Sequence, residues 1–166
     1  MTKPARAIDF DDRDLPSSIP AMPADLHAHL PYLLNRLSNR WNLDLSRDLS
    51  EHGINNTVLR ALSVLYIHKT LTVNEIASYA VVEQSNASRT IDTMVTAGLV
   101  KRQIAAHDLR RREVGLTPKG EALLRQLWPI MISNHQKLIQ GIPKKDLKIV
   151  LDTLLAMIHN VGEGPI

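Results

Sequence analysis

A short capped helix, closely followed by a second helix, constrains the fold of this chain more than any other feature of its sequence. Thr72 and Glu75 form a capping-box pattern, in which the threonine caps the helix and the glutamate bonds back to the cap. The pattern predicts a helix over residues 73–79 and, after a tight connection, a second helix over 84–97 that ends at Gly98. Two helices joined by so short a turn predict a helix-turn-helix.

A basic hairpin is predicted directly after this pair. Short extended segments over residues 99–105 and 113–116 flank a turn at 107–112. The segment from Lys101 to Arg112 contains five Lys and Arg residues and one acidic residue. This local excess of positive charge is larger than the net charge of +3 for the whole chain. A basic hairpin behind a helix-turn-helix is typical of a winged helix, and its charge attracts phosphate backbones or simply keeps a loop in solvent.

The remaining sequence is predicted to be helical apart from its start. Residues 1–23 carry four prolines and an acidic cluster, so we expect an irregular N-terminal arm. Pro31 interrupts the apolar period of the first helix, which therefore begins near that proline or kinks there. Apolar residues at three- and four-residue spacing predict further helices over about residues 25–53, 56–68, 117–140 and 144–160. We expect the helix over 117–140 to be kinked at Pro129.

The predicted fold class is mainly α with a small β-wing, a winged helix-turn-helix with N- and C-terminal dimerisation helices. We expect the winged region over residues 54–117 and a helical dimerisation region over 24–53 and 118–162, intertwined in one domain. The last two helices carry more apolar positions than a small winged helix buries, which favours a two-fold homodimer. A larger monomeric bundle is the alternative.

Composition and motifs exclude several classes of protein. The chain has no cysteine, so we expect neither disulfides nor a thiol sensor, and the cytoplasm is the expected compartment. No stretch approaches 18 apolar residues, so no membrane span is expected. We predict no enzyme, because the sequence lacks a nucleophile elbow and a glycine-rich phosphate loop, and we predict no cofactor. We also predict no metal site, since His27 and His29 lie on different helix faces.

The second helix of the pair carries small polar residues suited to reading DNA. The second helix of a helix-turn-helix enters the major groove, where Gln and Asn can pair with adenine and Arg with guanine. The alternative is an ordinary solvated helix face. The predicted contacts are Gln84, Ser85, Asn86, Ser88, Arg89 and Thr90.

These segments together resemble the MarR family of bacterial transcription regulators, over about residues 25–160. Residues 71–77 are similar to the family's supporting helix, and residues 85–90 with 97–100 are similar to its recognition helix and exit. The hairpin carries the family's Asp-x-Arg, five residues, Leu-Thr pattern at Asp108, Arg110, Leu116 and Thr117.

The resemblance implies a dimeric regulator bound to a pseudo-palindromic site on double-stranded DNA. Arg110 is then expected to enter the minor groove, where narrow A·T tracts concentrate negative potential, and Asp108 to hold that arginine in position. Arg111 and Arg112 are expected to add phosphate contacts or a second probe. A winged-helix module that binds proteins and has lost DNA binding is the alternative function.

The family also implies a small aromatic acid, phenol or thioester effector, bound between the first helix and the winged region. Arginines beside aromatic surface suit a carboxylate joined to a ring. The alternative is that the charged residues form a solvated flank of the first helix and the aromatic residues belong to the core. The predicted effector residues, together with Trp128 as a further aromatic wall, are His29, Tyr32, Arg36, Arg40, Trp41, Tyr66 and His68.

Overall fold

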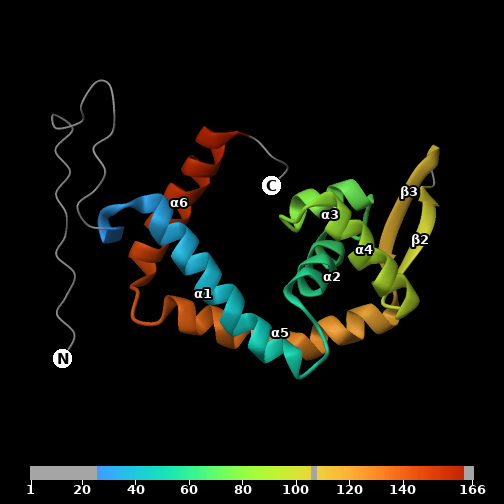
Figure 1. Cartoon of the computed structure of the whole chain (residues 1–166), viewed down its shortest axis with the longest axis horizontal. Helices are drawn as coiled ribbons and strands as arrows, with labels where there is room; N and C mark the ends of the chain where they lie inside the picture. Colours follow the sequence, from blue (N-terminus) through green and yellow to red (C-terminus); the bar gives the residue numbers. More distant parts are fainter. Residues whose placement is uncertain (1–25, 106–107, 163–166) are drawn as a thin grey trace. The chain divides into compact units, whose positions relative to one another are not determined.

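Figure 1 shows the computed structural model of the chain, which describes residues 26–105 and 108–162. The predicted arm over residues 1–23 lies outside the described residues. The chain divides into two compact units, residues 1–41 and 42–166, and each is described by itself. The boundary falls inside the first long helix, and the predicted division at residues 54 and 117 stays a prediction.

The elements confirm a mainly helical chain with a small antiparallel sheet. The first helix begins one residue before Pro31, so the first of its two predicted forms is confirmed. Pro129 lies inside α5, which continues through it. The helices are η2 (Leu26–Ala28), α1 (Leu30–Ser50), α2 (Asn56–His68), α3 (Val73–Tyr79), α4 (Gln84–Thr96), α5 (Pro118–Ile139) and α6 (Lys144–Val161), and the strands are β1 (Thr70–Leu71), β2 (Val100–Ala105) and β3 (Asp108–Leu116).

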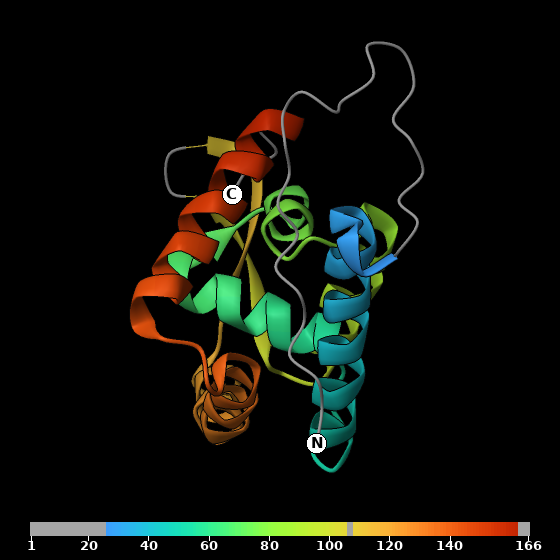
Figure 2. The same cartoon turned by 90° about the vertical axis from the view of Figure 1, so that its left-hand side faces the viewer.

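The core of the second unit lies where α2 meets α4, α5 and the sheet. Figure 2 looks along α5 and shows α2 crossing it, in agreement with the contacts between the two helices. Leu62 and Leu65 of α2, Ile91 of α4 and Leu127 of α5 are almost completely buried there, and Leu49 from the end of α1 joins them. Burial of these side chains supplies the main favourable free energy of folding for this unit.

The sheet has the strand order β1-β3-β2, with β3 antiparallel to both neighbours. Strand β1 pairs Thr70 with Gly115 and Leu71 with Val114, and the sequence did not predict it. The predicted turn at residues 107–112 is wrong, because β3 already begins at Asp108. Only the two ends of this segment pair with β2, Asp108 with Ala105 and Arg112 with Ile104, and the residues between them form an irregularity of the strand instead of a turn.

Within residues 26–105 and 108–162, no helix is long and apolar enough to cross a bilayer. The same residues contain no group of three or more His, Asp or Glu side chains that could hold a metal ion.

Candidate nucleic-acid interface

Glu83 fixes the start of the candidate recognition helix α4. Its carboxylate accepts hydrogen bonds from the backbone N–H groups of Ser85 at 3.0 Å and Asn86 at 3.2 Å, and from the Ser85 hydroxyl. These bonds, led by the one from the Ser85 hydroxyl, lower the pKa of Glu83 below its ordinary value. Glu83 therefore caps α4 by satisfying two of its N-terminal amides, and the side chains of this helix remain to meet a ligand.

The polar side chains of α4 divide between solvent and core. Gln84, Ser85, Asn86 and Arg89 are exposed and Ser88 is half-buried. Thr90 is only 9% exposed, because it follows Ala87 on the helix face that packs into the unit. Thr90 therefore lies on the packed face of α4, whereas the other five predicted side chains are exposed or half-buried. Its contact with DNA stays a prediction.

Two of the exposed side chains are oriented by neighbours. The Gln84 amide nitrogen donates to Oδ1 of Asn74 on α3 at 2.7 Å, which links the two helices of the pair. The Arg89 guanidinium lies 3.4 Å from the Ser85 carbonyl oxygen and 3.5 Å from its hydroxyl, so it folds back along α4. A helix that offers amide, hydroxyl and guanidinium groups at its N-terminal turns has the donors and acceptors needed to read base edges.

The junction of α4 and α5 fixes the base of the wing. Gly98, at φ +70°, ends α4 in a Schellman motif, with its N–H bonded to the Val95 carbonyl and the Leu99 N–H to the Met94 carbonyl. The Thr117 hydroxyl donates to the Gly98 carbonyl at 2.7 Å and accepts from the Gly120 N–H at 3.1 Å. The threonine of the Leu-Thr pattern therefore caps α5 and ties it to the end of α4.

The wing is the ribbon of β2 and β3 that extends from the helices of its unit in Figure 1. Ile104 pairs with Arg112, but Ala105 pairs with Asp108, so residues 109–111 form a bulge on β3. The side chains of Arg110 and Arg112 are exposed on this ribbon. The side chain of Asp108, predicted to hold Arg110, lies outside what the structure describes.

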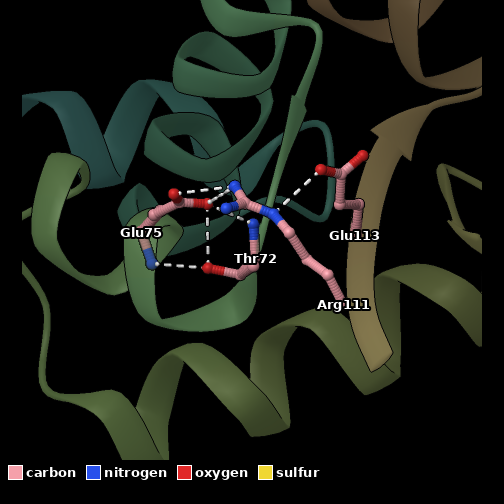
Figure 3. Close-up of polar contacts among 4 residues, drawn as sticks. All are labelled: Thr72, Glu75, Arg111 and Glu113. Carbon is pink, nitrogen blue, oxygen red and sulfur yellow. Dashed lines mark hydrogen bonds and ion pairs between the residues drawn. The ribbon is translucent and has the colours of Figure 1, made fainter. Parts of the chain in front are cut away.

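Arg111, in contrast, points back to α3, as Figure 3 shows. Its Nη2 lies 2.9 Å from both carboxylate oxygens of Glu75, and its Nε lies 3.0 Å from Oε1 of Glu113. Glu75 also completes the predicted capping box, with its Oε2 accepting from the Thr72 N–H at 2.7 Å. The hydrogen bond from the Thr72 backbone is the main cause that lowers the pKa of Glu75, and Arg111 adds to it.

The predicted effector residues divide between the two units. In the first unit His29 and Tyr32 are half-buried, Arg40 and Trp41 are exposed, and the Arg36 guanidinium donates to the Tyr32 hydroxyl at 2.9 Å.

In the second unit Tyr66 is exposed, and with Leu124, Arg125 and Trp128 it lines a hollow of about 240 Å³. The predicted residue His68 has another partner, because its ring stacks on Tyr79 with the centroids 4.4 Å apart. Tyr66 and the predicted aromatic wall at Trp128 are thus brought together, and His68 is not shown beside them.

Sequence reasoning missed three residues that organise the interface, namely Asn74, Glu75 as an ion-pair partner, and Glu83. The one available signal for Glu83 is its negative charge directly before a predicted helix, where the helix dipole favours an acidic side chain. The contacts of Asn74 and Glu75 join residues 10 and 36 positions apart, and no local pattern predicts them.

Comparison with known proteins gives one consistent family. A model described as the MarR family matches residues 52–111. The crystal structure of a MarR-family transcriptional regulator from Silicibacter pomeroyi is 34% identical, with a TM-score of 0.78 and a match covering 86% of this chain and 96% of that one.

Two more distant structures share the fold. S. aureus MepR in complex with DNA is 23% identical, with a TM-score of 0.73 over 81% of this chain and 98% of that one. Bordetella bronchiseptica BpsR, whose structure concerns regulation of its DNA binding by 6-hydroxynicotinic acid, is 18% identical, with a TM-score of 0.73 over 82% and 97%. With the capped helix pair and the wing, the Silicibacter match establishes that this chain belongs to the MarR family of transcriptional regulators, DNA-binding proteins that are not enzymes.

Proposed function

We propose that the protein is a homodimeric repressor that binds a pseudo-palindromic operator and is released by a small aromatic acid or its thioester. The observation that carries the DNA contact is the pairing of an exposed polar start of α4 with an exposed arginine wing on one unit. The proposed major-groove contacts are Gln84, Ser85, Asn86, Ser88 and Arg89, and the proposed wing contacts are Arg110 and Arg112, with Asp108 holding the arginine.

The dimer is supported by apolar surface that the single chain leaves in solvent. Every residue of α6, all of which are described, is exposed or half-buried. Exposed apolar patches of this kind mark association surfaces. The large exposed residues of α6 are Ile149, Val150, Leu151, Leu155, Ile158 and Val161. A two-fold pair of recognition helices would require half-sites about one turn of DNA apart.

The effector is supported by the hollow on the second unit. Tyr66 and Trp128 offer ring surface, Leu124 offers an apolar floor, and Arg125 offers a guanidinium that now pairs with Glu121 at 3.0 Å. An aromatic acid supplies both a ring for that surface and a carboxylate for the guanidinium. The heteroaromatic acid that regulates DNA binding by BpsR is of this chemical class.

The test of DNA binding is a titration of labelled duplex from the regulator's own promoter region, followed by anisotropy. We expect Arg110→Ala to weaken binding by about 1–3 kcal/mol while the fold stays intact, because the wing loses its minor-groove contact. Arg89→Ala should weaken binding with loss of preference at particular bases. Unchanged affinity in both variants would instead favour the winged module that binds proteins.

The test of the effector is a panel of aromatic acids followed by calorimetry on the free and DNA-bound protein. A releasing ligand must bind the two states with different affinity, and a coupling of about 1–3 kcal/mol lowers DNA affinity roughly 5- to 150-fold. Linkage requires operator DNA to weaken ligand binding by the same factor. Trp128→Ala should remove ligand binding and leave DNA binding in place, and equal ligand affinity in the two titrations would refute release.

A further inference from the structure

We propose that Arg111 is a positioning residue: it holds the wing against α3 through Glu75, and so sets where Arg110 meets DNA, instead of contacting a phosphate itself. The inference rests on the proposed contact between the wing and DNA. It replaces the expectation, made from sequence, that Arg111 adds a phosphate contact.

The wing needs such a tie because its backbone pairing to the body is short. In the described sheet, β1 meets β3 only at Gly115 and Val114, so from Glu113 outward β3 is paired with β2 alone. A two-stranded ribbon is marginally stable by itself and twists readily. Its angle to the helix-turn-helix must therefore be set by side chains beyond Val114.

The bulge on β3 aims Arg111 at α3. The register of β3 against β2 jumps between Ile104 and Ala105, which leaves residues 109–111 as extra residues on β3. A bulge bends its strand and redirects the side chains within it. Arg111 then reaches Glu75 on α3, 36 positions away in the sequence, with its Nη2 2.9 Å from both carboxylate oxygens.

The partner of Arg111 is itself rigidly held. Glu75 accepts hydrogen bonds from the Thr72 N–H and the Thr72 hydroxyl at 2.7 and 2.9 Å, because it belongs to the capping box of α3. The planar guanidinium bonds to Glu75 through Nη2 and to Glu113 through Nε, so the two carboxylates together constrain its orientation as well as its distance from α3. A wing tied to Glu75 is thereby tied to the helix that supports α4.

The same bonds make Arg111 a poor phosphate contact. Its Nε and Nη2 groups donate to Glu113 and Glu75, so two carboxylates surround one guanidinium. A phosphate approaching it would meet this negative charge at close range. On β2, Arg102 bonds to Asp92 of α4 at 2.6 Å, so both strands of the wing have an ion pair to a helix of the pair.

The Glu75→Gln variant distinguishes a positioning role of Arg111 from a phosphate contact, because the two roles predict opposite changes in operator affinity. Glutamine retains the capping box but removes the charge that holds Arg111. If Arg111 positions the wing, Glu75→Gln should weaken operator binding about 3- to 10-fold, Arg111→Ala should do the same, and the double variant should be no weaker than either single one. If Arg111 contacts phosphate, Glu75→Gln should free a cation and strengthen binding.

The salt dependence of binding supplies a second measurement with a matched control. Arg112→Ala, on the same strand, should reduce the slope of log affinity against log salt by about 1, as expected when a phosphate contact is lost. Arg111→Ala should lower affinity with an unchanged slope. A slope reduced equally in both variants, or tighter binding by Glu75→Gln, would overturn the proposal.

A measurement without DNA keeps the inference separate from the proposed function. The chain has no cysteine, so Ser78→Cys on α3 and Arg112→Cys on β3 allow two spin labels to be attached specifically. We expect one narrow distance distribution with Arg111 and Glu75 intact, and a broad one in the Glu75→Gln and Arg111→Ala backgrounds. An unchanged distribution would refute the tie even if no operator were found, whereas broadening with no DNA binding would refute only the proposed function.

Discussion

The winged region and the C-terminal helix use similar apolar residues in opposite ways. The leucines of α2 at positions 59, 62 and 65 are at most 3% exposed, because α4, α5 and the sheet cover them. Leu151 and Leu155 of α6 are 54% and 55% exposed. Both helices are amphipathic, so the difference lies in what the single chain places against them.

This difference separates what the chain completes alone from what it leaves for a partner. Each fully buried leucine contributes about 1.5–3 kcal/mol to folding, which gives the winged region its own core. The leucines of α6 contribute little until another surface covers them. We therefore expect the winged region to govern the stability of the fold and α6 to govern assembly.

A leucine-to-alanine substitution in each of the two regions tests this division of roles, and in the winged region it has the largest expected effect on the free energy of unfolding. Leu62→Ala should destabilise the fold by about 2–5 kcal/mol, because it removes buried methyl groups and leaves a cavity. Leu155→Ala should lower the free energy of unfolding much less at low protein concentration, where the chains are separate. Denaturation in urea at several protein concentrations measures both, and an equal cost at high dilution would contradict the comparison.

Charge on α6 tests assembly directly. Leu151→Glu combined with Leu155→Glu would place unpaired charges in the proposed dimer surface, and we expect the mass in solution to fall to that of one chain. Operator affinity should fall about 100-fold or more, because two linked half-site contacts become separate events. Light scattering and anisotropy measure the two effects, with Lys148→Glu on the same helix as the charge control. A monomer with full operator affinity would contradict the dimer.

A substitution at the junction of α4 and α5, at the base of the wing, should cause the next largest loss of stability. A Cβ on Gly120 would lie 2.1 Å from the Leu99 carbonyl oxygen, so Gly120→Ala must push α5 away from the end of α4. We expect a loss of about 1–3 kcal/mol, typical of overpacking. Ala122→Ser, at an exposed position of the same helix, is the control for changes in α5. Equal melting curves for the two variants would show that this contact adapts freely.

Sequence predicted the elements whose signals are local. The Thr72–Glu75 box and the helix end at Gly98 each depend on bonds between residues at most five positions apart, and the structure has both as expected. These signals work because capping bonds join neighbours along the chain.

The features that sequence missed depend on distant partners. Strand β1 has two residues and exists only because β3 passes beside it. The extension of β3 to Asp108 depends on β2, and the pairing of Arg111 with Glu75 depends on the bulge. Thr90 is polar by type but lies on the packed face of α4. Residue type and spacing do not specify such contacts, because tertiary packing decides them.

Low pH should reduce the folding stability of the winged region, because Glu75 becomes protonated. Its pKa is lowered in the folded protein, chiefly by the Thr72 backbone, from an ordinary value of 4.5. A lowered pKa contributes stability above the unfolded value, and that contribution is lost as the pH falls below 4.5 and through the folded value. Glu75→Gln should therefore lose less stability than the wild type between pH 7 and acid, with Glu51→Gln as an exposed control. Parallel pH profiles for all three proteins would contradict this role.

The smallest predicted effect concerns two helix ends that use one motif. Helix α3 ends as α4 does, with the Val81 N–H bonded to the Ser78 carbonyl and the Val82 N–H to the Ala77 carbonyl. The residue in the left-handed position is Gly98 at the end of α4 but Val81, at φ +52°, at the end of α3. A β-branched side chain is strained there, and Val81 is 80% exposed, so packing does not offset the strain.

Val81→Gly should therefore stabilise the winged region, by about 0.5 kcal/mol after the greater flexibility of glycine in the unfolded chain is subtracted. Gly98→Val, the reverse change at the equivalent position, should destabilise it by about 1–2 kcal/mol, since it introduces the same strain. Urea denaturation of the two variants beside the wild type measures both signs. Loss of stability in Val81→Gly would mean that the valine side chain, despite its exposure, supports the turn that leads into α4.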